Sequence, residues 1–87
     1  MTARELQIDK AVLNYLHTLD HGQDTEIGIH FQVLERWPVG EPRPSAFELA
    51  ESVKRLDAQK FITGIVSRFG KQKWNISDAG EAARLEM

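Results

Sequence analysis

Residues 45–80 read SAFELAESVKRLDAQKFITGIVSRFGKQKWNISDAG, and the hydrophobic pattern changes its period part-way along this stretch. Ser45 and Glu48 have the spacing of a capping box, with a hydroxyl at the N-cap and a carboxylate three residues later. The apolar residues that follow recur every three or four positions, which predicts an amphipathic helix from Ala46 to about Gln59. They are Ala46, Leu49, Ala50, Val53 and Leu56.

Beyond this helix the chain becomes rich in β-branched and aromatic residues, as strands are. Two such runs, 61–67 and 73–76, flank the turn 68–72 and predict a β-hairpin. Ser77 to Gly80 then open a last helix, which continues from Glu81 to Met87.

Two helices are expected before this stretch. Helical spacing predicts the first from about Ala3 to Leu19, with Asp9, Lys10, Asn14 and Thr18 left for solvent. The second, capped by Asp24 or Thr25, is expected to bury Ile27, Phe31, Leu34 and Trp37, although a short strand at 24–27 is an alternative for its start. The proline-rich segment 38–44 follows. The core candidates are Val12, Leu16, Phe31, Leu34, Leu49, Val53, Leu56, Ile62, Ile65 and Ile76.

The order helix, strand, basic turn, strand, together with Ile76-Ser77-Asp78-Ala79-Gly80, resembles the second half of a winged helix-turn-helix domain of bacterial or phage type. In many bacterial members of that superfamily, a hydrophobic residue followed by Ser/Thr-Asp/Glu-x-Gly closes the wing. The resemblance implies an α+β winged helix spanning 1–87 as one domain. We therefore expect a three-helix core, a wing of two or three strands and a short C-terminal helix.

Charge is divided unevenly along the chain, although the net charge is only −2. Residues 1–50 carry four Lys or Arg against eight Asp or Glu, whereas residues 54–73 carry six basic residues against Asp57 alone. Charge separated in this way attracts a polyanion to one face of a protein while the remainder repels it.

The resemblance implies that helix 45–59 reads the major groove of double-stranded DNA and that the wing, 61–76, contacts phosphates. Basic and hydroxyl side chains in these elements are suited to those contacts. The candidate nucleic-acid-binding residues are Arg43, Ser45, Ser52, Lys54, Arg55, Arg68, Lys71 and Lys73. Glu48 and Glu51 argue for the alternative, a solvated helix face, because carboxylates repel phosphates.

Two functions remain open at this point. One is a small transcriptional regulator, which by the resemblance is expected to be a homodimer through helix 1 and the C-terminal helix, since operators of this class are usually two-fold. The other is a winged helix that contacts proteins and does not bind DNA, because a fold alone does not decide function.

Other classes of function lack a sequence signal. The chain has no cysteine, no Gly-x-Ser-x-Gly and no phosphate-cradling glycine-rich loop, so we expect no enzyme and no cofactor. His17 and His21 have helical metal-site spacing, but no third ligand is evident and no metal site is predicted. Neither a signal peptide nor a membrane-spanning run is evident, and a cytoplasmic location is therefore expected.

Overall fold

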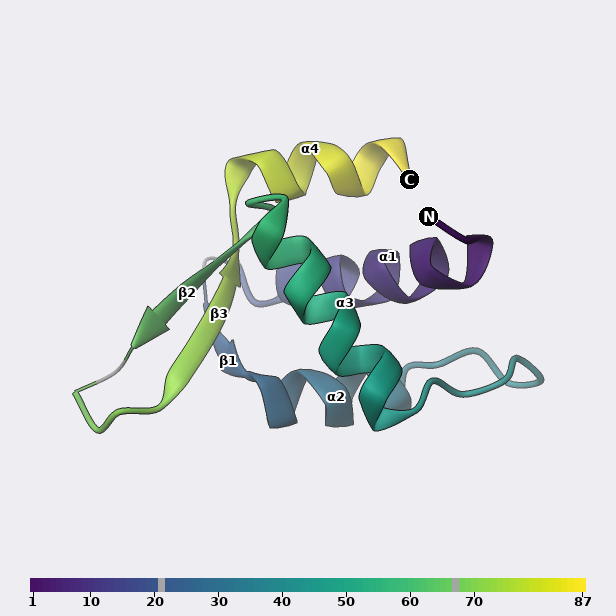
Figure 1. Cartoon of the computed structure of the whole chain (residues 1–87), viewed down its shortest axis with the longest axis horizontal. Helices are drawn as coiled ribbons and strands as arrows, with labels where there is room; N and C mark the ends of the chain where they lie inside the picture. Colours follow the sequence, from purple (N-terminus) through teal and green to yellow (C-terminus); the bar gives the residue numbers. More distant parts are fainter. Residues whose placement is uncertain (21, 67) are drawn as a thin grey trace.

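The computed structural model describes residues 1–20, 22–66 and 68–87. Its elements follow the order α1 (Ala3–Thr18), β1 (Asp24–Thr25), α2 (Glu26–Glu35), α3 (Ala46–Ala58), β2 (Ile62–Val66), β3 (Gln72–Ile76) and α4 (Asp78–Glu86) (Figure 1). The predicted α+β order is confirmed, and the short strand considered at 24–27 is present as β1.

Each helix begins at a hydroxyl side chain that accepts a hydrogen bond from a backbone N–H of the first turn. Thr2 and Ser45 form complete capping boxes with Glu5 and Glu48. Thr25 caps α2 and Ser77 caps α4 in the simpler form. These local bonds satisfy N–H groups that a helix leaves unpaired, so the helix starts follow from short-range sequence.

The three strands form one antiparallel sheet in the order β1-β3-β2. Ile62 pairs with Ile76 and Gly64 with Trp74, and Ile62 and Trp74 are buried. Gly64 makes room for the indole, because a Cβ built at Gly64 would lie 3.0 Å from Trp74 Cζ3. Trp74 therefore packs beneath the hairpin.

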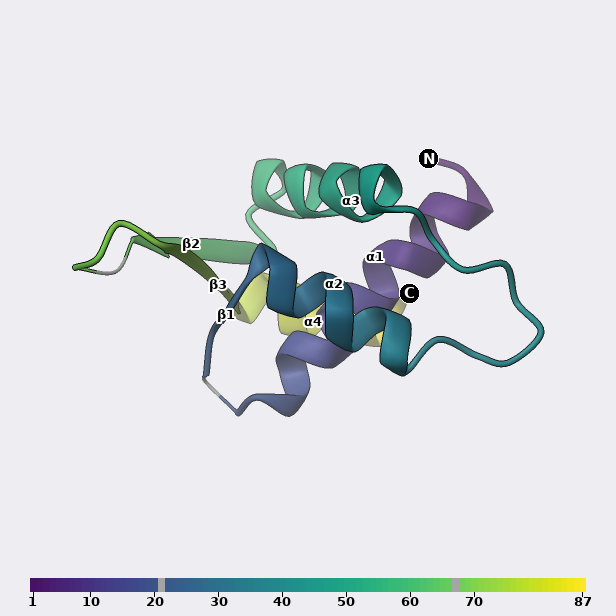
Figure 2. The same ribbon diagram turned by 90° about the horizontal axis from the view of Figure 1, so that it is seen from below.

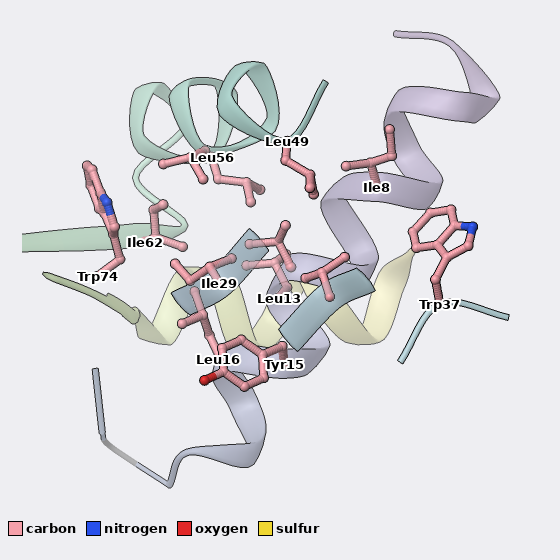
Figure 3. Close-up of a cluster of buried hydrophobic side chains, with 13 residues drawn as sticks. Ile8, Leu13, Tyr15, Leu16, Ile29, Trp37, Leu49, Leu56, Ile62 and Trp74 are labelled. Atoms are coloured by element: carbon pink, nitrogen blue, oxygen red, sulfur yellow. The ribbon is translucent and has the colours of Figure 1, made fainter. Parts of the chain in front are cut away.

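Helix α1 lies at the centre of the molecule and packs against α2, α3 and α4 (Figures 1 and 2). The core runs between these helices and the base of the sheet, with Trp37 and Trp74 at its two ends (Figure 3). Its buried apolar residues are Ile8, Val12, Leu13, Tyr15, Leu16, Ile29, Val33, Trp37, Leu49, Val53, Leu56, Ile62 and Trp74.

The predicted buried face of α2 is wrong for two of its residues. Ile27 is 82% exposed and Phe31 is 61% exposed, whereas Ile29 and Val33 are buried. Apolar residues occur on both sides of this short helix, so its spacing pattern does not choose between them. Its rotation depends instead on β1, which pairs with β3 and holds the start of the helix.

Ile65 is also wrong as a core residue, since it is 41% exposed. Side chains alternate across a strand, and Ile65 is an odd number of positions from the buried Ile62. Of the other candidates, Leu34 and Ile76 are only partly buried and pack against the core, while the remaining six are buried.

Candidate nucleic-acid interface

The β2–β3 hairpin carries its positive charge at and near its tip. Val66 pairs with Gln72, and the connection between the two strands, called the wing connection below, includes the described residues 68–71. Arg68 and Lys71 are exposed in this connection, and Lys73 is half-buried on the neighbouring strand. The hairpin projects beyond the helices (Figures 1 and 2), which makes its tip accessible from several sides.

Two polar residues of α3 point toward α1. Ser52 is fully buried, and its hydroxyl donates a 2.6 Å hydrogen bond to Asp9 Oδ1. Arg55 donates to Asp9 from Nη2 at 2.7 Å and to Glu5 from Nη1 at 3.1 Å. Asp9 itself is fully buried. The hydrogen bond to Asp9 raises the pKa of Arg55 above its ordinary value, so the guanidinium stays charged inside this network.

A second polar contact joins α1 to the first turn of α3. Arg4 Nε donates to Glu48 Oε2 at 3.0 Å, and its Nη1 donates to the carbonyl of Pro42. The hydrogen bond from Arg4 is the largest cause that lowers the pKa of Glu48 to about 2. The Glu48 carboxylate therefore accepts hydrogen bonds both from the Ser45 backbone, in the capping box, and from Arg4.

The exposed side of α3 is mixed in charge. Lys54 is largely exposed, with its Nζ 3.5 Å from Glu51 Oε1. Asp57 is exposed in the last turn and Phe47 is 73% exposed in the first. This surface offers a polyanion less attraction than the hairpin does.

Solved structures with the same arrangement exist. A transcriptional regulator from Clostridium thermocellum superposes with a TM-score of 0.77 at 12% sequence identity, over 99% of this chain and 82% of that chain. The fold is a winged helix. A candidate transcriptional regulator from Thermoplasma acidophilum matches with a TM-score of 0.62 at 16% identity, over 93% of this chain and 79% of that one.

Neither protein-family models nor curated proteins match the sequence. At such low identity the structural likeness concerns the winged-helix fold alone, in which the β2–β3 hairpin is the wing.

Within the winged helix, the predicted site residues separate into different places. Ser52 and Arg55 face α1, so their assignment to the groove-reading surface is corrected: both are engaged by the carboxylate of Asp9. Lys54 remains on the exposed side of α3. Arg68, Lys71 and Lys73 lie together on the wing.

Arg43 and Ser45 belong to the other end of the molecule. The 38–44 loop and the tip of the wing extend in opposite directions along the long axis (Figures 1 and 2). Arg43 is exposed, and its Nη2 donates to the carbonyl of Leu34 at 2.9 Å, which anchors the loop to α2. Ser45 is the exposed N-cap of α3.

Of the two histidines with metal-site spacing, the structure describes His17 alone. His21 lies outside the described residues, and His17 Nδ1 is 2.8 Å from Glu81 Oε2. No group of three or more His, Cys, Asp or Glu suited to a metal occurs in residues 1–20, 22–66 and 68–87. Over the same ranges, no helix has the length and apolar character to cross a membrane.

The sequence pattern does not reveal two features of this region. Asp9 is fully buried and not exposed to solvent as expected, and it lies on the same helical stripe as the buried Leu13 and Leu16. The second is Phe69, which is 85% exposed in the turn between two cationic residues. Its signal was an aromatic residue inside a basic turn.

Proposed function

We propose that residues 1–87 form one winged-helix domain that binds double-stranded DNA and regulates transcription without catalysing a reaction. The observation that carries the proposal is the wing: Arg68, Lys71 and Lys73 gather on a projecting hairpin, and no Asp or Glu occurs between Asp57 and Asp78. The description of both structural neighbours as regulators or candidate regulators supports the same conclusion.

The proposal gives the wing the larger share of the binding energy. Its cations contact phosphates, while Lys54 is the remaining basic candidate on the exposed side of α3. Because Glu51 and Asp57 share that side, base contacts from α3 contribute less than in a strongly basic recognition helix. Contact with about three to five phosphates gives a slope of log affinity against log salt of roughly −3 to −5.

The test is a titration of a labelled random-sequence duplex with the protein, in which fluorescence anisotropy reports binding. The titration is repeated at salt concentrations from about 50 to 200 mM. The wing variant is Arg68→Glu with Lys71→Glu, and the matched control is Lys10→Glu with Arg36→Glu, which changes the net charge equally on α1 and after α2. We expect the wing variant to bind more weakly with a slope about 2 units shallower, and the control to bind nearly as well as the wild type.

Equal binding by the wing variant and the wild type would show that the wing has no such role. Selection from random-sequence DNA tests the regulatory part of the proposal, because a regulator enriches particular sites.

A second function, protein recognition without DNA binding, is favoured by one observation. Ile27 and Phe31 lie one turn apart on α2 and are both largely exposed, which is unusual for a pair of large apolar side chains on a small domain. Failure of the wild type to bind any duplex at low salt would favour this function over the first.

We also propose that the protein acts as a homodimer, with α1 and α4 at its interface. Inside one chain α4 already packs on α1, where Arg84 Nη1 donates to Asn14 Oδ1 at 3.4 Å. Leu85 is 75% exposed on α4, so its apolar side chain is available for contact with a second copy.

A further inference from the structure

The side chain of Phe69 stands exposed in the wing connection. It is 85% exposed, more than Phe31 or Phe47. Single exposed apolar residues are common on protein surfaces, so exposure alone gives this ring no function. Its position and its neighbours carry the argument.

The backbone next to Phe69 makes a sharp, uncovered turn. Gly70 has φ of +80°, a conformation that glycine adopts without the strain that a side chain would cause. A Cβ built at Gly70 would have no atom within 4 Å. The backbone at the tip can therefore come close to a surface, and the adjacent aromatic ring can enter a narrow space.

The charges around the ring suit a nucleic acid as the partner. Arg68 precedes Phe69, Lys71 follows two residues later, and the nearest acidic residues in the sequence are Asp57 and Asp78. An apolar ring between cations suits a narrow groove lined by phosphates, because the cations offset the negative potential while the ring contacts bases. An apolar protein surface would not require these charges.

We propose that Phe69 is an apolar wedge that enters the minor groove of duplex DNA and partly unstacks one base step. The wing cations hold the tip against the phosphates on either side of the groove, and the ring fills the gap that opens between neighbouring base pairs. This inference rests on the proposed function, since it requires duplex binding through the wing. The wedge adds one property to that function: the protein prefers DNA sites that contain pyrimidine–purine steps, because these steps deform easily.

The experiment uses the full chain and a duplex of repeated TA steps in which 2-aminopurine replaces one adenine. Unstacking of this base raises its fluorescence. We expect the wild type to raise the signal, Phe69→Leu to retain much of the rise, and Phe69→Ala to lose it. Phe69→Ala is also expected to lower affinity about tenfold with no change in the salt slope, because it removes stacking and no charge.

Phe31→Ala is the matched control, since it removes another exposed phenyl ring, on α2. It is expected to behave as the wild type in both measurements. Circular dichroism confirms that each variant is folded.

Three results would overturn the inference. If the wild type binds the duplex without a fluorescence rise, or if Phe69→Ala gives the same rise, Phe69 is not a wedge. The proposed function is unaffected by that result. Tighter binding to the single strand than to the duplex also removes it, since the ring would then stack on unpaired bases. Absence of duplex binding by the wild type overturns the wedge and the proposed function together.

Discussion

Asp9 joins the first helix to the third through a fully buried carboxylate. It accepts hydrogen bonds from Ser52 and from Arg55, whose guanidinium also reaches Glu5. A buried charge is tolerated only when it is paired and hydrogen-bonded, and this network meets both conditions. Its consequence is that α3 presents Ser52 and Arg55 inward and Lys54 outward.

The change Asp9→Ala is expected to lower the free energy of unfolding by about 3–5 kcal/mol, because it leaves the Arg55 guanidinium and the Ser52 hydroxyl without their partner. Urea unfolding followed by tryptophan fluorescence measures the loss. Asp57→Ala, an exposed change on α3, serves as the control and is expected to stay within about 0.5 kcal/mol. A similar result for both variants would mean that the network does not stabilise the fold.

Gly80, in the first turn of α4, lies where the packing leaves no room for a side chain. Ser77 caps α4, donates from its hydroxyl to the Lys60 carbonyl at 2.7 Å, and donates from its backbone to the Phe61 carbonyl at 3.0 Å. These bonds bring the first turn of α4 against the backbone at Phe61, where a Cβ on Gly80 would collide with the Phe61 carbonyl oxygen.

Gly80→Ala is therefore expected to destabilise the protein by about 1–3 kcal/mol, the usual effect of overpacking. This reverses the ordinary gain of about 1 kcal/mol for the same change inside a helix. Thermal unfolding compares it with Ala82→Gly, an exposed change in α4 that tests helix propensity alone. An increase in melting temperature for Gly80→Ala would show that the close packing does not exist.

At the scale of elements, Arg4 connects three parts of the chain. Its guanidinium bonds Glu48 at the start of α3 and the Pro42 carbonyl in the loop, and it lies 5.7 Å from the centroid of the Trp37 ring. One side chain thus fixes the positions of the first turn of α1, the first turn of α3 and the proline-rich loop relative to one another.

This contact makes stability depend on pH in a defined direction. The hydrogen bond with Arg4 is the main cause that lowers the pKa of Glu48 to about 2. The ionised Glu48 therefore contributes its full share to folding stability above the ordinary carboxyl pKa, and this stability is lost as pH falls toward 2. Urea midpoints measured between about pH 6 and pH 2 are expected to fall less steeply for Glu48→Gln than for the wild type. Arg4→Met should flatten the same part of the curve, and parallel curves for all three proteins would contradict the assignment.

The molecule as a whole measures 40 × 24 × 21 Å, with the wing at one end of the long axis and the 38–44 loop at the other. The predicted positive stretch is thus divided between a projecting wing and a helix whose Arg55 serves the interior. The wing is where the positive charge is most concentrated and most accessible.

The proposed dimer is tested at this scale by sedimentation. We expect the wild type to have about twice the 9.9 kDa mass of one chain. Leu85→Glu is expected to yield monomers, because it places a charge in the apolar contact between copies. Ile27→Glu, an equally exposed apolar position on α2, is the control and should leave the dimer intact. A monomeric wild type would refute the dimer.

The sequence by itself determined the four helices, the hairpin and the motif that closes the wing, because caps, hydrophobic period and β-branched runs act over a few neighbouring residues. Only the tertiary structure decided which side of α2 is buried, since Ile27 and Ile29 are equally apolar and the pairing of β1 with β3 selects between them. It likewise decided that Ser52 and Arg55 face inward. Their partner Asp9 lies more than forty residues away, and such a contact depends on how α1 and α3 pack together.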